Sequence, residues 1–406
     1  MRMINVAILG FGVVGAGAAE VIRMNADKIE NHLGEPLRVK KILDIRDFPD
    51  SPFADLVTHE ASDVFDDPEI KVVIETIGGA KIAYEFTKTA LSKGKSVVTS
   101  NKELVATHGP ELMKIAQDNG CQYLYEAAVG GGIPIIRPLH RCLAANRIMR
   151  IAGIVNGTTN YILSSMKSSG LSYDEALKEA QAKGYAEQNP SADVDGIDAQ
   201  RKLSILSSIA LEGEYVSPEE IHTKGISEIK LDDINFATRI GCNIKLLAVF
   251  SNMEGNQPSA YVAPHFVSKK SQLAPVEGVF NAILVKGNAV GTTMYYGRGA
   301  GKLPTASAVV ADVLEASRAP ETTAYTKNWY VPEKRVTAEY GDIVSNYVVR
   351  AKAGSMENLV DKFSAYTQKQ VWDGNDCCAI IVYGIANKDI DALASSVGGS
   401  YLHYME

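Results

Sequence analysis

Short apolar runs alternate with amphipathic segments over the first 135 residues of the chain. The apolar runs predict strands over residues 4–9, 39–45, 72–77, 96–100 and 121–127. The amphipathic segments predict helices over residues 14–29, 82–94 and 110–120. Strands that alternate with helices through short connections are typical of a parallel sheet with helices on both faces. We therefore predict an α/β, doubly wound first domain over residues 1–135.

The pattern changes twice beyond this domain. Residues 136–290 predict an α+β domain for substrate binding, catalysis and dimerisation, with helices over 171–187, 197–211, 216–225 and 232–241 and strands over 244–251 and 259–267. Ser172 and Glu175 form a capping box at the first of these helices. A helix over 304–316 lies in the segment 291–320, which we expect to complete the first domain. Residues 340–406 predict strand, helix, strand, strand, helix, strand, the order of a ferredoxin-like fold.

The composition is that of an ordinary globular protein. Its 46% hydrophobic and 22% charged residues exclude extensive disorder, and its 406 residues suggest two or three domains. The net charge of −7 argues against nucleic acid and anionic membranes as partners. Five dispersed cysteines favour a reducing compartment, and no apolar run is long enough to cross a membrane.

The N-terminus admits two interpretations. A charged start followed by an apolar stretch of small residues is also the pattern of a secretory signal peptide. Four glycines would weaken the apolar helix that such a peptide needs: Gly10, Gly12, Gly15 and Gly17. We therefore expect a cytoplasmic protein.

A glycine-rich turn joins the first predicted strand to the first predicted helix. Its residues are Gly10, Phe11, Gly12, Val13, Val14 and Gly15. In a dinucleotide-binding (Rossmann) turn of this spacing, the first glycine makes a tight turn, the second lets the backbone approach a pyrophosphate, and the third lets helix and strand pack closely. The helix N-terminus then favours the negative phosphates. Because a strand precedes the turn and a helix follows it, we interpret it as a binding site for NAD or NADP rather than as an ordinary tight turn.

Two residues at the end of the second predicted strand bear on the choice between these cofactors. An acidic residue there favours the 2′-hydroxyl of NAD, whereas an arginine favours the 2′-phosphate of NADP. Asp44 and Arg46 are both present, and either can also be a solvated loop charge. The sequence leaves the choice open.

Polar residues and glycines follow the fourth and fifth predicted strands. Ligands of an open α/β sheet bind at the carboxyl ends of its strands, so Ser100 and Lys102 are candidate contacts to cofactor or substrate. Glu126 and three glycines at 130–132 follow the fifth strand, and backbone carbonyls exposed in such a loop suit a hard cation such as Na⁺. A surface charge and a flexible turn are the alternative interpretations.

The densest group of charges lies in residues 184–202. Four carboxylates precede Arg201 and Lys202, namely Glu187, Asp193, Asp195 and Asp198. Asp198 and Lys202 stand at i and i+4 of a predicted helix, so they share one face. The carboxylates can receive an ammonium group, and a partly desolvated lysine can exchange protons near neutral pH. An ordinary ion pair on a helix surface is the alternative.

Two further patterns concern ligands. Residues 296–301 are rich in glycine and precede the predicted 304–316 helix, which suits contact with phosphate or ribose, or a linker between domains. The histidines and cysteines show no zinc-ligand spacing.

Together the motifs resemble those of homoserine dehydrogenases. The resemblance runs from about residue 4 to residue 320 through GFGVVG, VTSNK, EAAVGGGIPII, IVNGTTNYIL, KGYAE with DVDGIDAQRK, and GRGAGKLPTASAVVAD. It implies a monofunctional NAD(P)-dependent oxidoreductase that interconverts L-homoserine and L-aspartate 4-semialdehyde in threonine and methionine biosynthesis. A related oxidoreductase with another small substrate, and a nucleotide-binding amino-acid sensor without catalysis, are the alternatives.

The resemblance also implies roles for individual residues. Lys202 would be the proton donor and acceptor, Lys102 would contact cofactor and substrate, and Glu187, Asp193 and Asp198 would surround the amino acid. Beyond the glycine turn, the nucleotide would touch Thr76, Gly184 and Gly301. A sodium site would consist of Glu126 with the backbone oxygens of Val129, Gly131 and Ile133. By analogy with the family we expect a homodimer or a higher homo-oligomer.

Residues 340–406 resemble an ACT regulatory domain, a common amino-acid sensor. The loop after its first strand, at residues 353–356, lacks the turn that such domains often use for ligand binding. Two roles therefore stay open: binding of an amino-acid effector such as threonine, and dimerisation alone.

Overall fold

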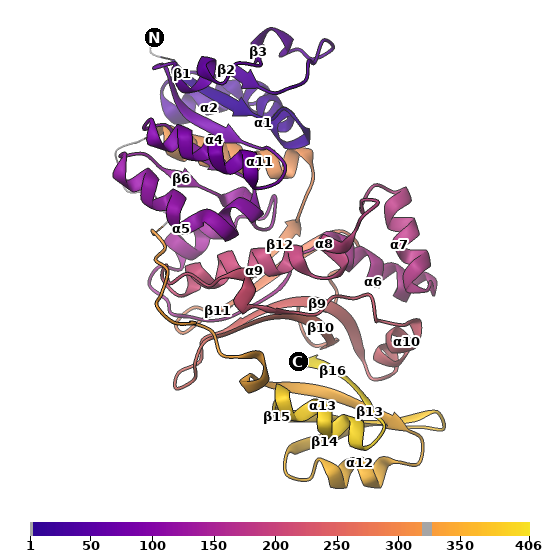
Figure 1. Cartoon of the computed structure of the whole chain (residues 1–406). Coiled ribbons are helices and arrows are strands. Elements are labelled where there is room, and N and C mark those ends of the chain that lie inside the picture. Colours follow the sequence, from indigo (N-terminus) through magenta and orange to yellow (C-terminus); the bar gives the residue numbers. More distant parts are fainter. Residues whose placement is uncertain (1–2, 319–326) are drawn as a thin grey trace. The chain divides into compact units, whose positions relative to one another are not determined.

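The computed structural model describes residues 3–318 and 327–406, and the chain divides into two units (Figure 1). Unit 1 comprises residues 1–147, 204–217 and 295–333, and unit 2 comprises residues 148–203, 218–294 and 334–406. Residues 1–2 of the predicted first domain and residues 319–320 of the segment expected to complete it lie outside the described residues. In the described part of the chain, no helix is both long and apolar enough to cross a membrane.

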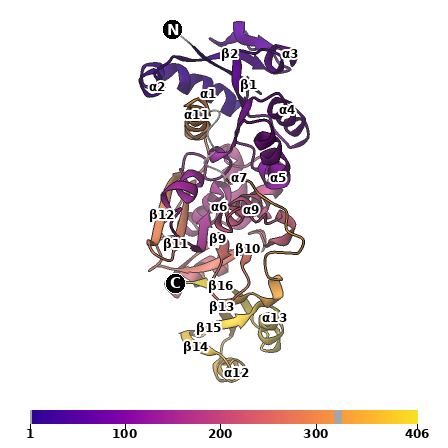
Figure 2. The same ribbon diagram turned by 90° about the vertical axis from the view of Figure 1, so that its left-hand side faces the viewer.

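Unit 1 is built on a six-stranded parallel sheet in the order β3-β2-β1-β4-β5-β6. Its strands are β1 (Ile4–Leu9), β2 (Leu37–Leu43), β3 (Val57–Thr58), β4 (Ile70–Glu75), β5 (Ser96–Thr99) and β6 (Tyr123–Leu124). Its helices are α1 (Val13–Met24), α2 (Ala26–Leu33), α3 (Ser62–Phe65), α4 (Lys81–Ser92), α5 (Lys102–Asp118) and α11 (Lys302–Arg318). Helices α1, α2 and α11 lie on one face of the sheet and α4 and α5 on the other (Figure 2). This parallel order with two helical layers confirms the predicted Rossmann fold.

Three predicted elements of unit 1 differ in extent. The helix expected over 14–29 is two helices, because the backbone leaves the helical conformation at Asn25. The strand expected over 121–127 is only Tyr123–Leu124, because a short 3₁₀ turn begins at Glu126. The helix expected over 110–120 begins at Lys102, where the Asn101 side chain accepts a hydrogen bond from the backbone N–H of Leu104.

The predicted start of this helix at residue 110 is wrong because of Pro110. A proline inside a helix normally breaks it, because it offers no N–H to the carbonyl four residues earlier. In α5 that carbonyl belongs to Ala106, and the Tyr215 hydroxyl donates to it at 2.6 Å. A side chain from a distant segment therefore satisfies the carbonyl, and the helix continues through the proline.

Unit 2 is built on a ten-stranded mixed sheet in the order β12-β11-β7-β9-β10-β16-β13-β15-β14, with β8 paired to β10. Its strands are β7 (Ile148–Ile154), β8 (His222–Thr223), β9 (Cys242–Ser251), β10 (Ser259–Ser268), β11 (Phe280–Gly287), β12 (Gly291–Arg298), β13 (Val344–Lys352), β14 (Thr367–Asp373), β15 (Cys377–Ala386) and β16 (Ser400–Met405). Its helices are α6 (Gly157–Ser169), α7 (Tyr173–Ala182), α8 (Ser191–Val194), α9 (Ile197–Ala210), α10 (Leu231–Arg239), α12 (Met356–Lys362) and α13 (Asn387–Ser396). β12 and α9 each continue into unit 1.

The predicted elements of unit 2 are largely confirmed. Helix α7 begins at the predicted capping box of Ser172 and Glu175. The helix expected over 216–225 is absent from the described structure. That segment instead forms a 3₁₀ turn at Pro218–Glu220 and strand β8, because His222 and Thr223 pair with the backbone of β10. The sequence patterns did not indicate β7, α6, β11 or β12.

The C-terminal residues form the predicted strand, helix, strand, strand, helix, strand order from β13 to β16. Their core is a cluster of buried residues that includes Tyr347, Leu359 and Phe363. The last strand also joins the rest of unit 2, because β16 pairs in parallel with β10, with His403 opposite His265. The predicted domain boundaries near residues 135, 290 and 340 therefore stay predictions, since one sheet crosses the last two of them.

Helix α11 belongs to unit 1. It packs so closely on α1 that a Cβ on Gly17 would lie 2.8 Å from the carbonyl oxygen of Lys302. Asp312 of α11 is fully buried and accepts hydrogen bonds from the backbone N–H of Glu126 at 2.7 Å and from the guanidinium of Arg137 at 2.6 Å. This carboxylate joins α11 to the segment that follows β6.

Asp312→Ala should therefore destabilise unit 1. The substitution leaves a buried N–H and a half-buried guanidinium without their acceptor, so we expect a loss of about 2–3 kcal/mol in the free energy of unfolding, measured by urea denaturation. The control is Glu315→Ala on the same helix, which removes a more exposed ion pair with Arg141 and should cost less than about 1 kcal/mol. Equal losses in the two variants would show that Asp312 has no special role.

Candidate functional site

The glycine turn has the geometry that the sequence predicts. Gly10 adopts a φ of +84°, which other residues rarely adopt. A Cβ on Gly15 would lie 2.1 Å from the carbonyl oxygen of Gly10, so the strand and the helix approach each other here only because Gly15 has no side chain. A Cβ on Gly12 would meet nothing within 4 Å, so open space lies beside the middle of the turn. The tight turn, the open approach and the close packing are the three features of a pyrophosphate-binding turn.

The start of α1 is also suited to an anion. Gly12 is the N-cap residue and offers no side-chain cap, and the first turn of α1 carries no acidic residue. The Thr76 hydroxyl donates to the carbonyl oxygen of Gly10 at 2.7 Å, which holds the turn against the end of β4. The backbone N–H groups and the helix dipole at this end favour a phosphate. The residues present therefore fit the pyrophosphate of a dinucleotide.

Asp44 and Arg46 form an ion pair at the end of β2. The Asp44 carboxylate is buried and accepts the backbone N–H of Phe11 at 2.7 Å and the guanidinium of Arg46 at 3.0 Å. Burial acts to raise the pKa of Asp44, but the hydrogen bonds from Arg46 and Phe11 outweigh it and lower the pKa to about 2. The Arg46 side chain is 59% exposed, whereas that of Asp44 is 5% exposed. The charge that reaches the surface is therefore that of the arginine.

Asn101 joins the carboxyl ends of β4 and β5. Its side-chain amide donates to the carbonyl oxygens of Ile77 at 3.2 Å and Gly79 at 2.7 Å, while its oxygen caps α5. The half-buried Ser100 and Lys102 flank it, and Lys102 is the first residue of α5. Both predicted residues therefore lie at the edge of the sheet where ligands of this fold bind.

Glu75 lies beneath this edge and was missed in the sequence. It is fully buried at the end of β4, where its carboxyl group accepts hydrogen bonds from the Thr99 hydroxyl and the backbone N–H of Ile77, both at 2.6 Å. Burial raises the pKa of Glu75 to about 7, although both hydrogen bonds act to lower it. The signal in the sequence was an acidic residue within the apolar run of residues 72–77.

The two glycine-rich loops of unit 1 pack against each other. A Cβ on Gly131 would lie 2.3 Å from the carbonyl oxygen of Gly299, and the backbone N–H of Gly132 donates to the carbonyl oxygen of Arg298 at 3.1 Å. Gly301 adopts a φ of +125°. Contact between two backbones, which leaves no room for side chains, thus explains these glycines.

Glu126 supports the same loop through its side chain. Its buried carboxylate accepts the backbone N–H groups of Ile135, Ile136 and Arg137 at 2.7, 2.9 and 2.7 Å. The predicted cation site consists of Glu126, whose carboxylate holds these three N–H groups, and the backbone oxygens of Val129, Gly131 and Ile133. Within residues 3–318 and 327–406, no group of three or more His, Cys, Asp or Glu residues could hold a metal ion. The sodium site stays a prediction.

Lys202 is the centre of the polar cluster in unit 2. Its ammonium group donates to Asp198 Oδ2 and to the carbonyl oxygen of Val155, each at 2.7 Å. The two side chains are only 10% and 5% exposed, so this i, i+4 pair is not an ordinary pair on a helix surface. Removing both charges from water costs several kcal/mol, and the surrounding hydrogen bonds offset part of that cost.

Asn156 connects the carboxylates of this cluster and was not predicted. Its amide group donates to Asp198 Oδ2 at 2.8 Å and to Asp193 Oδ1 at 2.7 Å. Its side-chain oxygen accepts the backbone N–H of Thr159 and so caps α6. One asparagine therefore starts the helix and orients two of the predicted substrate-binding carboxylates. An asparagine after an apolar run and before Gly157 was the available signal.

Gly184 and Glu187 lie on an exposed segment near the start of α6. The Thr158 hydroxyl donates to the carbonyl oxygen of Tyr185 at 2.7 Å, which holds the segment against that helix. The Gln181 side chain donates to the carbonyl oxygen of Glu187 at 3.0 Å. None of the described contacts joins the Glu187 carboxylate to Lys202 or Asp198. The structure thus brings together Asp193, Asp198 and Lys202, and it leaves the role of Glu187 a prediction.

Two family models match the chain. The model for the NAD-binding domain of homoserine dehydrogenase matches residues 10–126, and the model for homoserine dehydrogenase matches residues 134–314. The chain is 42% identical to homoserine dehydrogenase of Bacillus subtilis over 318 residues, which cover 77% of this chain and 73% of that protein.

Solved structures give the same result. A homoserine dehydrogenase from Thiobacillus denitrificans has a TM-score of 0.91 and 36% identity, and the match covers 100% of this chain and 99% of the other. A hyperthermophilic archaeal homoserine dehydrogenase in complex with NADPH has a TM-score of 0.66 and 30% identity, with 78% and 98% of the two chains covered.

Glu75 should make stability depend on pH. The unfolded chain releases this proton near the ordinary value of 4.5 and the folded chain near 7, so the folded state binds more protons between these values. Stability should therefore fall by about 3 kcal/mol as pH rises from 4.5 to 7, and not change further above pH 7.

The test compares thermal midpoints of wild type and Glu75→Gln across this pH range. At pH 4.5 both carry an uncharged side chain at position 75, so the gap between them should widen in favour of Glu75→Gln as pH rises. A gap that is constant with pH would contradict the raised pKa.

Proposed function

The chain belongs to the homoserine dehydrogenase family, and we propose that Lys202 serves as its proton donor and acceptor in the interconversion of L-homoserine and L-aspartate 4-semialdehyde. The observation that carries the assignment is the buried pair of Lys202 and Asp198, held by Asn156 and Val155. Proton transfer gives this lysine a role that a sensor without catalysis does not need.

The proposed chemistry needs one proton and one hydride. The nicotinamide of NAD(P), when bound, carries the hydride. In the reducing direction Lys202 gives a proton to the aldehyde oxygen as that oxygen gains negative charge, and in the oxidising direction it takes the proton from the hydroxyl group. Asp198 stabilises the ammonium form, and Asn156 keeps the carboxylate directed at it. No covalent intermediate is required.

Acidic residues around Lys202 support recognition of an amino acid. Asp193 and Asp198 share the Asn156 amide and provide negative charge for the substrate ammonium group. Glu187, on the exposed segment beside α6, supplies a third carboxylate. Lys102 at the start of α5 provides a cation for the cofactor or the substrate.

Arg46 favours NADP over NAD in this proposal. The Asp44 carboxylate that would bind the 2′-hydroxyl of NAD already accepts hydrogen bonds from Phe11 and Arg46. The exposed guanidinium of Arg46 is suited to a 2′-phosphate. The NADPH complex of the archaeal relative is consistent with this choice.

Further assignments rest on the family and on single features. We place the enzyme in threonine and methionine biosynthesis and in the cytoplasm, and all five cysteines are free, as a reducing compartment requires. A homodimer, a sodium ion held by backbone carbonyls near Gly131, and an amino-acid effector at the C-terminal region complete the proposal.

Lys202→Ala should lower turnover strongly with little effect on cofactor binding. Loss of the proton-transferring group should lower kcat with L-homoserine by about 100-fold or more. The matched control is Lys224→Ala, which removes an exposed lysine from another i, i+4 pair and should keep wild-type kcat. Initial rates of NAD⁺ and NADP⁺ reduction provide the measurement. Substantial turnover by Lys202→Ala would refute the assigned role.

Arg46→Ala should change the cofactor preference. A charge-assisted bond to the 2′-phosphate implies a loss of about 10- to 100-fold in kcat/KM for NADP⁺, with kcat/KM for NAD⁺ unchanged or raised. Lys41→Ala in the preceding strand β2, which removes a cation 3.7 Å from Asp63, serves as the control. Equal losses with both cofactors would show that Arg46 supports the fold instead of reading the phosphate.

A further inference from the structure

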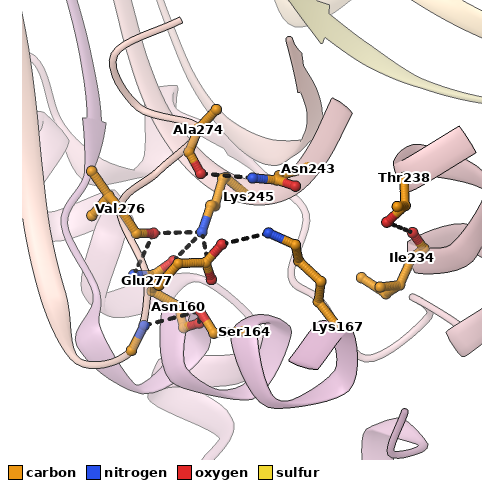
Figure 3. A network of polar contacts seen from close by, with 11 residues as sticks. Asn160, Ser164, Lys167, Ile234, Thr238, Asn243, Lys245, Ala274, Val276 and Glu277 are labelled. Atoms are coloured by element: carbon orange, nitrogen blue, oxygen red, sulfur yellow. Dashed lines mark hydrogen bonds and ion pairs between the residues drawn. The ribbon is translucent and has the colours of Figure 1, made fainter. Parts of the chain in front are cut away.

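A second buried lysine lies in unit 2, apart from the contacts of Lys202. Lys245 stands in β9 and is 1% exposed. Its ammonium group donates to Asn160 Oδ1 at 3.1 Å and to the carbonyl oxygen of Val276, and it lies 3.5 Å from the carboxylate of Glu277 (Figure 3). Burial lowers the pKa of Lys245 to about 8, although Glu277 acts to raise it. A fold has no need of a lysine here unless its hydrogen bonds hold something in place.

These hydrogen bonds join the connection between β10 and β11 to helix α6. Besides accepting from Lys245, the Asn160 amide donates to the carbonyl oxygens of Val276 at 3.2 Å and Phe280 at 3.0 Å. On the same helix, the Ser164 hydroxyl accepts the backbone N–H of Gly278 at 3.0 Å. Three hydrogen bonds thus fix this connection against the first turns of α6. Lys245 adds one hydrogen bond to each side, to Asn160 and to Val276 (Figure 3).

The N-terminal end of α6 lies next to the contacts of Lys202. The backbone N–H of Asn160 donates to the carbonyl oxygen of Asn156 at 3.3 Å, so the two asparagines lie one helical turn apart. Asn156 orients Asp198, and the preceding carbonyl of Val155 accepts from Lys202. A Cβ on Gly157 would lie 2.8 Å from the carbonyl oxygen of Val279, so the connection presses directly on the start of the helix.

We propose that Lys245 is a positioning residue for the reaction, which holds the first turn of α6 through Asn160 and thereby places Val155 and Asn156 around Lys202 and Asp198. The proposal rests on the function proposed above. In this proposal Lys245 touches neither the substrate nor Lys202. It affects the reaction only through the position of helix α6. Small displacements of a catalytic group are sufficient for large losses of rate.

The test is the kinetics of Lys245→Met, which keeps the length of the side chain and removes its donors. We expect kcat with L-homoserine to fall about 10- to 100-fold while KM for NADP⁺ stays within about twofold, because the glycine turn belongs to the other unit. The pH dependence of kcat should also change, because Lys202 loses its fixed partners. Lys167→Met is the matched control: it removes the other lysine bound to Glu277, at 2.8 Å, and leaves Asn160 untouched.

A second variant separates positioning from folding. Asn160→Ala removes the link to α6 but keeps Lys245 paired with Val276 and Glu277, so it should reproduce the fall in kcat and the changed pH profile even if Lys245→Met fails to fold. The proposal would be overturned if Asn160→Ala kept the wild-type kcat and pH profile. It would also be overturned if Lys245→Met folded with a lowered Tm and kept both. Absence of homoserine-dependent turnover in wild type would instead refute the proposed function itself.

Discussion

The structure of unit 2 depends on how it accommodates a buried lysine beside a buried carboxylate. Lys202 loses most of its contact with water, and that loss costs several kcal/mol unless oxygen acceptors replace the water. Asp198 lies one turn earlier on the same helix, and the Val155 carbonyl lies where β7 passes into α6. The need for these oxygen acceptors therefore fixes the orientation of α9 about its axis and the residue at which α6 begins. Asn156 serves both helices, because its side-chain oxygen caps α6 and its amide group donates to Asp198 of α9.

Buried carboxylates do comparable work in the loops of unit 1. The carboxylates of Asp44 and Asp312 accept backbone N–H groups from segments distant in sequence, and that of Glu126 accepts three from the loop that follows it. A loop has few backbone partners of its own, so a carboxylate with two oxygens can hold it at a cost that its charge-assisted hydrogen bonds offset. Asp44 holds the glycine turn to the end of β2, and Asp312 and Glu126 connect α11 with the segments on either side of the triple-glycine loop. Loops that are held in place before a ligand binds lower the entropic cost of binding it.

Local patterns were sufficient for much of the fold. The parallel sheet of unit 1, the glycine turn and the C-terminal element order all follow from features within a few residues of one another. Asp198 and Lys202 were identifiable because an i, i+4 spacing on a helix is local. The burial of this pair could not be predicted, because it depends on a contact with the Val155 carbonyl that no local pattern indicates.

The failures share one cause. Pro110 indicated that a helix starts there, because a proline normally breaks a helix. The helix continues because the Tyr215 hydroxyl donates to the Ala106 carbonyl, and Tyr215 belongs to a segment that is distant in the sequence. His222 and Thr223 were assigned to a helix, because their pairing partners lie in β10. Glu75, Asn156 and Lys245 escaped notice for the same reason: each is a polar residue whose role appears only when its long-range partners are in place.

The central claim is that an amine at position 202 transfers the proton. It can be tested directly with Lys202→Cys, treated with 2-bromoethylamine so that the thiol becomes a thioether carrying a primary amine of nearly lysine length. Lys202→Ala, treated in the same way, controls for alkylation of the other five cysteines. We predict that turnover with L-homoserine returns only in the alkylated Lys202→Cys protein. If mass spectrometry shows complete alkylation at position 202 and the protein is still as inactive as Lys202→Ala, the amine is not the proton donor and the account is wrong.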